Sequence, residues 1–153
     1  MSLVVNLYLV HHGSAVEPWV NPQRPLSDDG CEHVARMAAA AAARGARPSV
    51  VWHSGKLRAR QTAEAFWRSC NPLAECAATS DLQPDDPPER IRDRLCGESR
   101  DILVAGHFPH LQRLLSLLSG PAVQAFPQHG VVALASDDED GSWKERWRIE
   151  SPV

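Results

Sequence analysis

The chain has 153 residues, which is enough for one domain with a single core, and we expect residues 1–153 to form one domain without a linker. Lysine and arginine total 16 against 19 acidic residues, so a net charge of -3 gives no basic field to attract nucleic acid or an anionic membrane. The four cysteines show no Cys-x-x-Cys spacing, which argues against a zinc knuckle or a redox pair and predicts reduced thiols.

The first predicted element is a strand over residues 3–10. It has no basic segment before it and is far shorter than a membrane span, so we interpret it as a strand rather than a signal peptide, and a cytoplasmic location follows by default. The loop over 14–26 contains three prolines, which exclude a helix. Ser27 is a good N-cap for a helix that continues to Arg44 and ends at Gly45.

The rest of the chain alternates between strands and helices. An amphipathic helix with Pro109 in its first turn follows one of these strands, and a hairpin with a turn at 137–141 ends the pattern. We therefore expect an α/β fold, a three-layer α/β/α sandwich with a mostly parallel sheet that binds ligands at the carboxyl ends of its strands. The other predicted elements are strands over 49–53, 101–106, 130–135 and 143–149, helices over 56–69 and 89–95, and an acidic loop over 81–88.

Two of the apolar strands run directly into histidine. The first leads into His11, His12 and Gly13, and the strand over 101–106 is followed by His107. A histidine at the mouth of a buried strand is costly unless it is satisfied or used, and a glycine lets the backbone turn sharply and approach a ligand. These residues indicate a functional site at the strand ends.

Four motifs, in their order along the chain, resemble those of a known family. The chain resembles the histidine phosphatase superfamily over most of its length, and the order and spacing of the motifs are most similar to the short SixA-type phosphohistidine phosphatases. This resemblance implies a phosphoglycerate-mutase-like fold. One residue departs from the pattern, because His11 stands where the Arg-His-Gly triplet of the family has its arginine. The motifs are VHHG (10–13), RPLSDDG (24–30), SGKLRARQTA (54–63) and VAGH (104–107).

The resemblance also implies a role for each site residue. His12 would be the nucleophile and form a phosphohistidine intermediate. Arg24 and Arg58 would clamp the phosphate with their planar donors, and His107 would stabilise the transition-state charge by a hydrogen bond. His11 would also bind phosphate, but an unperturbed histidine is mostly neutral at pH 7, so its charge would depend on a nearby phosphate dianion. The family uses no metal, and we expect no cofactor.

The choice of substrate depends on a general acid. A phosphate ester leaves as a poor alkoxide and needs a proton donor, whereas the labile P–N bond of phosphohistidine needs less assistance. No motif selects an acid among Asp81, Asp85, Asp86 and Glu89. The first hypothesis is therefore a phosphatase that acts on phosphohistidine in a protein, such as a histidine phosphotransfer domain. The alternatives are a phosphatase of small phosphate esters and a catalytically impaired binder of phosphate or a phosphoprotein, because of His11.

Other residues are weaker candidates for a metal site or a substrate contact. His11 and His12 are adjacent on a strand and are predicted to point to opposite faces, so one metal ion would not use both. Trp19, in the loop over the predicted pocket, either contacts the substrate or covers the core. The remaining histidines lack paired metal-ligand spacing and are predicted to be surface or packing residues: His33, His53, His110 and His129.

Overall fold

The computed structural model describes residues 4–121, 124–136 and 141–151. None of the helices in these ranges is long and apolar enough to cross a membrane. The strands are β1 (Asn6–His11), β2 (Val50–His53), β3 (Glu75–Ala78), β4 (Ile102–Gly106), β5 (Val131–Ser136) and β6 (Trp143–Ile149). The helices are α1 (Asp28–Ala43), α2 (Leu57–Cys70), α3 (Glu89–Leu95) and α4 (His110–Ser119).

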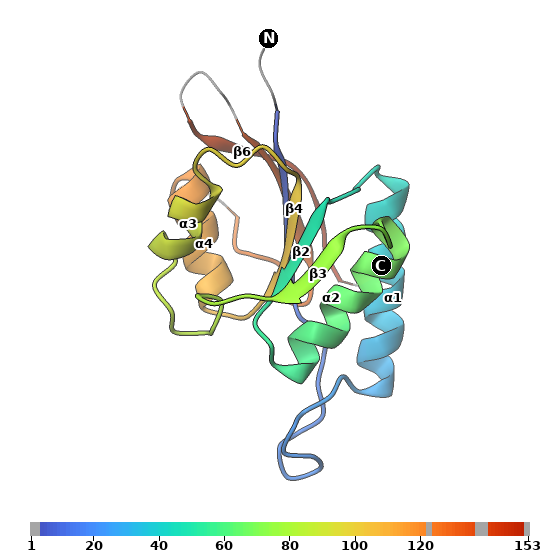
Figure 1. Cartoon of the computed structure of the whole chain (residues 1–153). Helices are drawn as coiled ribbons and strands as arrows, with labels where there is room; N and C mark the ends of the chain where they lie inside the picture. Colours follow the sequence, from blue (N-terminus) through green and yellow to red (C-terminus); the bar gives the residue numbers. More distant parts are fainter. Residues whose placement is uncertain (1–3, 122–123, 137–140, 152–153) are drawn as a thin grey trace.

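One six-stranded sheet lies at the centre of the molecule, in the order β3-β2-β4-β1-β5-β6. Helices α1 and α2 cover one face and α3 and α4 cover the other, which confirms the predicted three-layer sandwich (Figure 1). The pairs among β3, β2, β4 and β1 are parallel, whereas β5 pairs with β1 and β6 in antiparallel fashion. The sheet is therefore mostly parallel, with the predicted hairpin at one edge. Of the predicted turn at 137–141, only Gly141 lies within the described residues.

Two details differ from the sequence prediction. Strand β3 is not predicted, because its sequence Glu-Cys-Ala-Ala contains none of the β-branched or aromatic residues typical of strands. It forms at a sheet edge by pairing with β2. Pro109 caps α4 rather than lying in its first turn.

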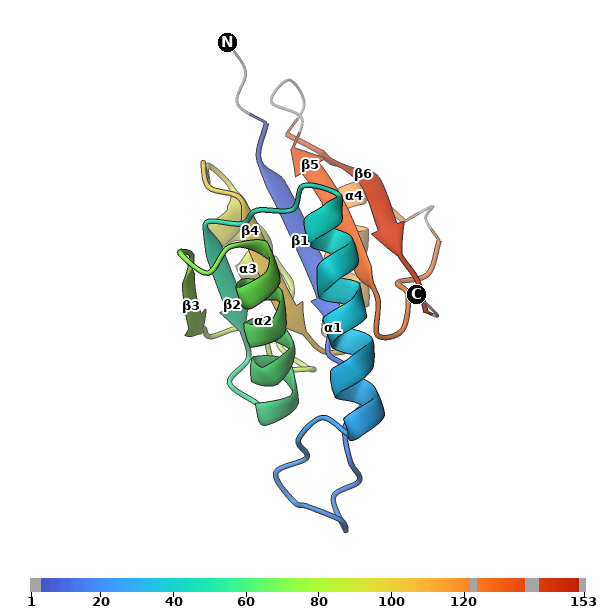
Figure 2. The same ribbon diagram turned by 90° about the vertical axis from the view of Figure 1, so that its right-hand side faces the viewer.

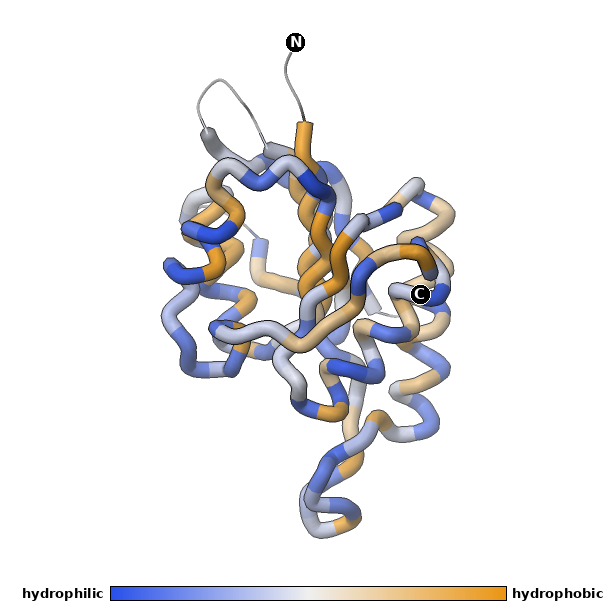
Figure 3. The backbone as a smooth tube through the Cα atoms, viewed as in Figure 1, coloured by the Kyte–Doolittle hydropathy of each residue, from blue (hydrophilic) through white to orange (hydrophobic). Residues whose placement is uncertain are grey.

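Strand β1 divides its side chains between the two cores, as the period of two in a strand requires. Leu7 and Leu9 belong to the cluster under α3 and α4, and Tyr8 and Val10 belong to the cluster under α1 and α2. Apolar residues accordingly follow the central strands in Figure 3. This alternation directs His11, the last residue of β1, toward the α4 side of the sheet.

The carboxyl ends of the parallel strands meet at one edge of the sheet, beyond which the loop over 14–26 projects (Figure 2). This loop leads into α1, where the Ser27 hydroxyl accepts the Gly30 amide at 3.0 Å, as predicted for an N-cap. A Cβ on Gly30 would lie 2.1 Å from the Ser14 carbonyl oxygen, so only glycine fits there. The start of α1 is therefore packed directly against the segment that leaves β1.

Replacing Ser27 by alanine removes the acceptor of the Gly30 amide. We expect Ser27→Ala to lower the free energy of unfolding by about 1 kcal/mol, measured by urea denaturation. Ser119→Ala is the matched control, because the Ser119 hydroxyl only donates to the Leu115 carbonyl within its own helix. Equal losses in both variants would contradict a capping role for Ser27.

Candidate active site

The ring of His12 is oriented by the residue that follows it. Nδ1 lies 2.7 Å from the carbonyl oxygen of Gly13, and because a carbonyl can only accept, Nδ1 carries the proton. Burial lowers the pKa of His12 to about 4, partly offset by this hydrogen bond, and the positive charge of Arg58 lowers it further. The ring is therefore neutral at pH 7, with its lone pair on Nε2.

Gly13 is fixed between α1 and α2. The Thr62 side-chain oxygen accepts the Gly13 amide at 3.0 Å, and its hydroxyl donates to the Arg58 carbonyl at 2.8 Å. A Cβ on Gly13 would lie 2.4 Å from Val34. Close packing against Val34 thus leaves no room for a side chain at Gly13, and the close approach of a ligand there stays a prediction.

His107 lies directly after β4, is 2% exposed, and its ring centroid is 5.1 Å from that of His12. Its Nε2 is 2.6 Å from the Ser54 hydroxyl oxygen. We assign Ser54 as the donor, because its proton has no other acceptor in the described part of the chain. The His107 proton then resides on Nδ1, which is buried and has no partner there. Burial and the neighbouring His12 lower the pKa of His107 to about 3, so this ring is also neutral.

Two arginines face these histidines. The charges of Arg58 and Arg24 both lower the pKa of His12, and burial followed by the charge of Arg24 lowers the pKa of Arg58. Arg24 has a left-handed backbone (φ 51°), and its Nε donates to a carbonyl of its own loop. The Gln61 side-chain oxygen accepts the Leu26 amide at 2.7 Å and so ties that loop to α2. Arg58 Nε is buried without a partner among the described residues.

The residues predicted from the four motifs therefore meet at one edge of the sheet. The edge holds two permanent cations, Arg24 and Arg58, and two neutral imidazoles, those of His12 and His107. Arg58 Nε and His107 Nδ1 also offer buried N–H groups without a partner in the described part of the chain. This combination suits a compact oxyanion such as a phosphoryl group. Sequence reasoning did not identify the supporting residues Ser54, Gln61 and Thr62. The spacing of Arg58 and Thr62 at i and i+4 contains a signal, since it puts both on one face of α2.

His11 differs from the expectation. Its ring is stacked on Phe108 on one side and His129 on the other, with centroid separations of 3.8 and 4.8 Å. Burial, then the neighbouring His12 and His129, lower the pKa of His11 to about 2. The ring is therefore neutral at pH 7 without a bound anion, and its protonation beside a phosphate dianion stays a prediction. Its Nδ1 accepts the His129 amide at 2.8 Å, so its proton is on Nε2.

His129, which the sequence predicts to be a surface or packing residue, is half-buried and lies beside the site histidines. Its Nδ1 lies 2.7 Å from the His12 carbonyl oxygen, and one ring nitrogen from each of His11, His12 and His129 lies within 4.8 Å of the others. The expectation that the rings of His11 and His12 point to opposite faces is wrong, whereas the prediction that one metal ion would not use both stays a prediction. His12 follows the last residue of β1, so strand alternation no longer separates the two rings.

The spacing of this histidine cluster would suit a metal ion, but its chemistry does not. His11 already uses Nδ1 as an acceptor and carries a proton on Nε2, so it has no free lone pair. The charges of Arg24 and Arg58 also act on His12 and would oppose a metal cation. We therefore assign no metal role to the cluster.

The acids considered as proton donors are engaged elsewhere or lack a contact with the site. Asp81 pairs with Arg90 at 3.2 Å, and Asp86 accepts the Gln83 amide at 2.9 Å. Within the described residues, no hydrogen bond or ion pair joins His12 or His107 to any of the four: Asp81, Asp85, Asp86 and Glu89.

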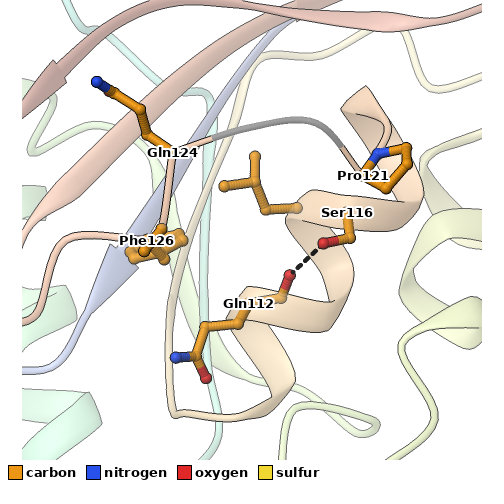
Figure 4. A pocket seen from close by; sticks show the side chains of 7 residues that line it. Gln112, Ser116, Pro121, Gln124 and Phe126 are labelled. Carbon is orange, nitrogen blue, oxygen red and sulfur yellow. Dashed lines mark hydrogen bonds between the residues drawn. The ribbon is translucent and has the colours of Figure 1, made fainter.

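Trp19 is 80% exposed, so it does not cover the core, and a contact with substrate remains a prediction. A hollow of about 170 Å³ beside α4 is lined by Gln112, Ser116 and Phe126 together with four neighbouring residues (Figure 4). None of the predicted site residues lines it. The hollow is therefore separate from the histidine and arginine site.

Solved structures share this architecture over nearly the whole chain. A structure of the protein histidine phosphatase SixA complexed with tungstate has a TM-score of 0.84 and 22% identity, covering 95% of this chain and 97% of that chain. A putative phosphohistidine phosphatase SixA from Agrobacterium tumefaciens gives 0.80 and 21%, covering 97% and 99%. Phosphoglycerate mutase from Plasmodium falciparum gives 0.68 and 20%, covering 95% and 91%. No family model and no curated protein matches the sequence significantly. The similarities confirm the phosphoglycerate-mutase-like fold.

Acidification should destabilise the protein through its neutral histidines. The pKa values of His11, His12 and His107 are lowered to about 2, 4 and 3, whereas each would protonate near pH 6.5 in the unfolded chain. Between pH 7.5 and 5.5 the unfolded state therefore binds protons that the folded state does not. We expect the free energy of unfolding to fall by about 1 kcal/mol for each of these histidines, measured by urea denaturation at both pH values.

The variant His11→Phe is a control for this pH effect. It keeps an aromatic ring against Phe108 but cannot titrate, so the difference in unfolding free energy between the two pH values should shrink. A wild-type protein that is equally stable at pH 7.5 and 5.5 would show that the histidines are not held neutral.

Proposed function

We propose that the protein is a phosphatase that removes phosphate from phosphohistidine on a protein and forms a phosphoenzyme on His12. The observation that carries the proposal is the fixed tautomer of His12, whose Nδ1 proton is held by Gly13 and whose neutral ring offers Nε2 as a nucleophile. The similarity in fold to SixA phosphatases supports it. Tungstate, bound by one of those proteins, is a tetrahedral oxyanion like phosphate.

The proposed reaction has two displacements at phosphorus. In the first, the His12 Nε2 lone pair forms an N–P bond as the P–N bond to the substrate imidazole breaks. Arg24 and Arg58 hold the equatorial oxygens and balance their charge, and the unpartnered His107 Nδ1–H donates to one of these oxygens. In the second, water displaces His12 and releases inorganic phosphate.

A phosphohistidine substrate fits the site better than a phosphate ester. No acidic side chain contacts His12 or His107 in the described residues, and an alkoxide leaving group would need such a donor. An imidazole leaving group depends less on acid assistance. We accordingly propose a phosphoprotein, such as a histidine phosphotransfer domain, as the substrate and the cytoplasm as its location.

The neutral state of His11 favours a second candidate, an impaired phosphate binder. The family's arginine would add a permanent cation that this pocket lacks. Losing one preorganised donor typically reduces the rate by about a hundredfold to a thousandfold. A loss of this size still leaves an enzyme, which is why we rank the phosphatase first.

Loss of the nucleophile should abolish turnover. Incubation with a labelled phosphohistidine protein, followed by quenching, should trap an acid-labile, base-stable phosphoenzyme in the wild type and none in His12→Asn. A panel of small phosphate esters tested in parallel distinguishes the substrate classes. Full activity in His12→Asn contradicts the covalent mechanism, and phosphate binding without any turnover in the wild type supports the impaired binder.

Arg58 and Arg60 lie on the same helix and form a matched pair for a second test. Arg58 acts on His12, whereas Arg60 is exposed and pairs with Glu64 at 2.7 Å. We expect Arg58→Gln to lower kcat/KM for the phosphohistidine protein by about a hundredfold, because transition-state charge loses a donor. Arg60→Gln should change kcat/KM little. Similar losses in both variants would argue against a specific phosphate contact for Arg58.

A further inference from the structure

His129 lies beside the proposed nucleophile, yet the two displacements above give it no role. Its backbone has φ 55°, a left-handed conformation that costs free energy in a residue other than glycine. Three hydrogen bonds hold it there. Its amide donates to His11 Nδ1 at 2.8 Å, its carbonyl accepts from His33 Nε2 at 3.2 Å, and its ring Nδ1 donates to the His12 carbonyl at 2.7 Å. The ring is thus fixed in one orientation.

This orientation determines which nitrogen of His129 can react. The His12 carbonyl can only accept, so Nδ1 keeps its proton and Nε2 is the nitrogen left to accept one. No hydrogen bond engages this Nε2 among the described residues, and the side chain is half-buried, within reach of water. One ring nitrogen of His129 lies within 4.8 Å of one from His12. The His129 ring, whose centroid is 6.1 Å from that of His12, therefore brings an unengaged nitrogen near the proposed phosphoenzyme.

The second displacement needs such an acceptor, because the attacking water must lose a proton. His11 cannot provide it, since its Nδ1 accepts a backbone amide and its Nε2 is protonated. His107 cannot either, since its Nε2 accepts from Ser54. No acidic side chain contacts His12 in the described residues. Among the rings around His12, this leaves His129.

We propose that His129 is the general base that activates water for hydrolysis of the His12 phosphoenzyme. The water oxygen forms a bond to phosphorus while the bond between phosphorus and His12 Nε2 breaks, and that electron pair returns to His12. The water proton passes to His129 Nε2 and then to solvent. The inference rests on the proposed function, and it makes His129 a catalytic residue of the second step rather than a packing residue.

The variant His129→Asn removes the base but is expected to keep the backbone conformation and the hydrogen bond to the His12 carbonyl. Asparagine tolerates a left-handed backbone and its side-chain amide can donate to the His12 carbonyl, but it is not a base. Gln128→Ala, at the exposed neighbour, is the matched control. Rapid quenching with a labelled phosphohistidine protein should show unchanged phosphoenzyme formation in His129→Asn. Phosphoenzyme decay should slow by about a hundredfold, so that the phosphoenzyme accumulates.

A second variant tests the base directly. Glycine accommodates φ 55° without strain, so His129→Gly should keep the loop and open a space beside His12. Added imidazole should then accelerate phosphoenzyme decay in His129→Gly and have no effect on the wild type. A purely structural role would not respond to imidazole.

The outcomes separate this inference from the function on which it rests. A wild type that forms no phosphoenzyme overturns the proposed function and this inference with it. A wild type that forms one, together with a His129→Asn variant whose phosphoenzyme decays at the wild-type rate, overturns the role of His129 alone. Equal slowing of formation and decay, without rescue by imidazole, also overturns it and makes His129 a positioning residue.

Discussion

The hydrogen bond from His12 Nδ1 to the Gly13 carbonyl is the interaction on which the site depends, because it determines which ring nitrogen is left with a lone pair. It can do so only if Gly13 is held in place. Thr62 binds the Gly13 amide, and Val34 packs so closely that a side chain at this position would not fit. The tautomer of one histidine is thus set by the packing of α1 and α2 against the end of β1.

Burial and fixed charge act together in this site. A buried imidazole resists protonation, and the nearby arginines add to that resistance, so the histidines stay neutral while the guanidinium groups keep their charge. The pocket therefore combines permanent cations, which suit an anion, with uncharged ring nitrogens, which in the proposed function form the bond to phosphorus and accept a proton. These two requirements would conflict if the histidines were themselves the cations.

The extent to which the sequence predicts the structure depends on the range of each interaction. Strand alternation, the Ser27 cap and the apolar runs before His12 and His107 are local signals, and they predict the sheet and the edge where the site lies. The role of His129 depends on contacts with residues 117 and 118 positions away, which no local pattern reveals. The lowering of the His11 pKa to about 2 likewise follows from burial between Phe108 and His129, which the sequence does not reveal.

The histidine at position 11 and the backbone conformation of His129 depend on each other through one hydrogen bond. His11 Nδ1 accepts the His129 amide, and an arginine could not replace it there because a guanidinium has donors but no acceptor. The left-handed backbone at His129, and with it the contact between its ring and the His12 carbonyl, therefore depends on an acceptor at position 11. An arginine at position 11 would add a cation and at the same time release this loop. The histidine is consequently better understood as part of a different pocket, with less charge and one more nitrogen base, than as a weakened arginine.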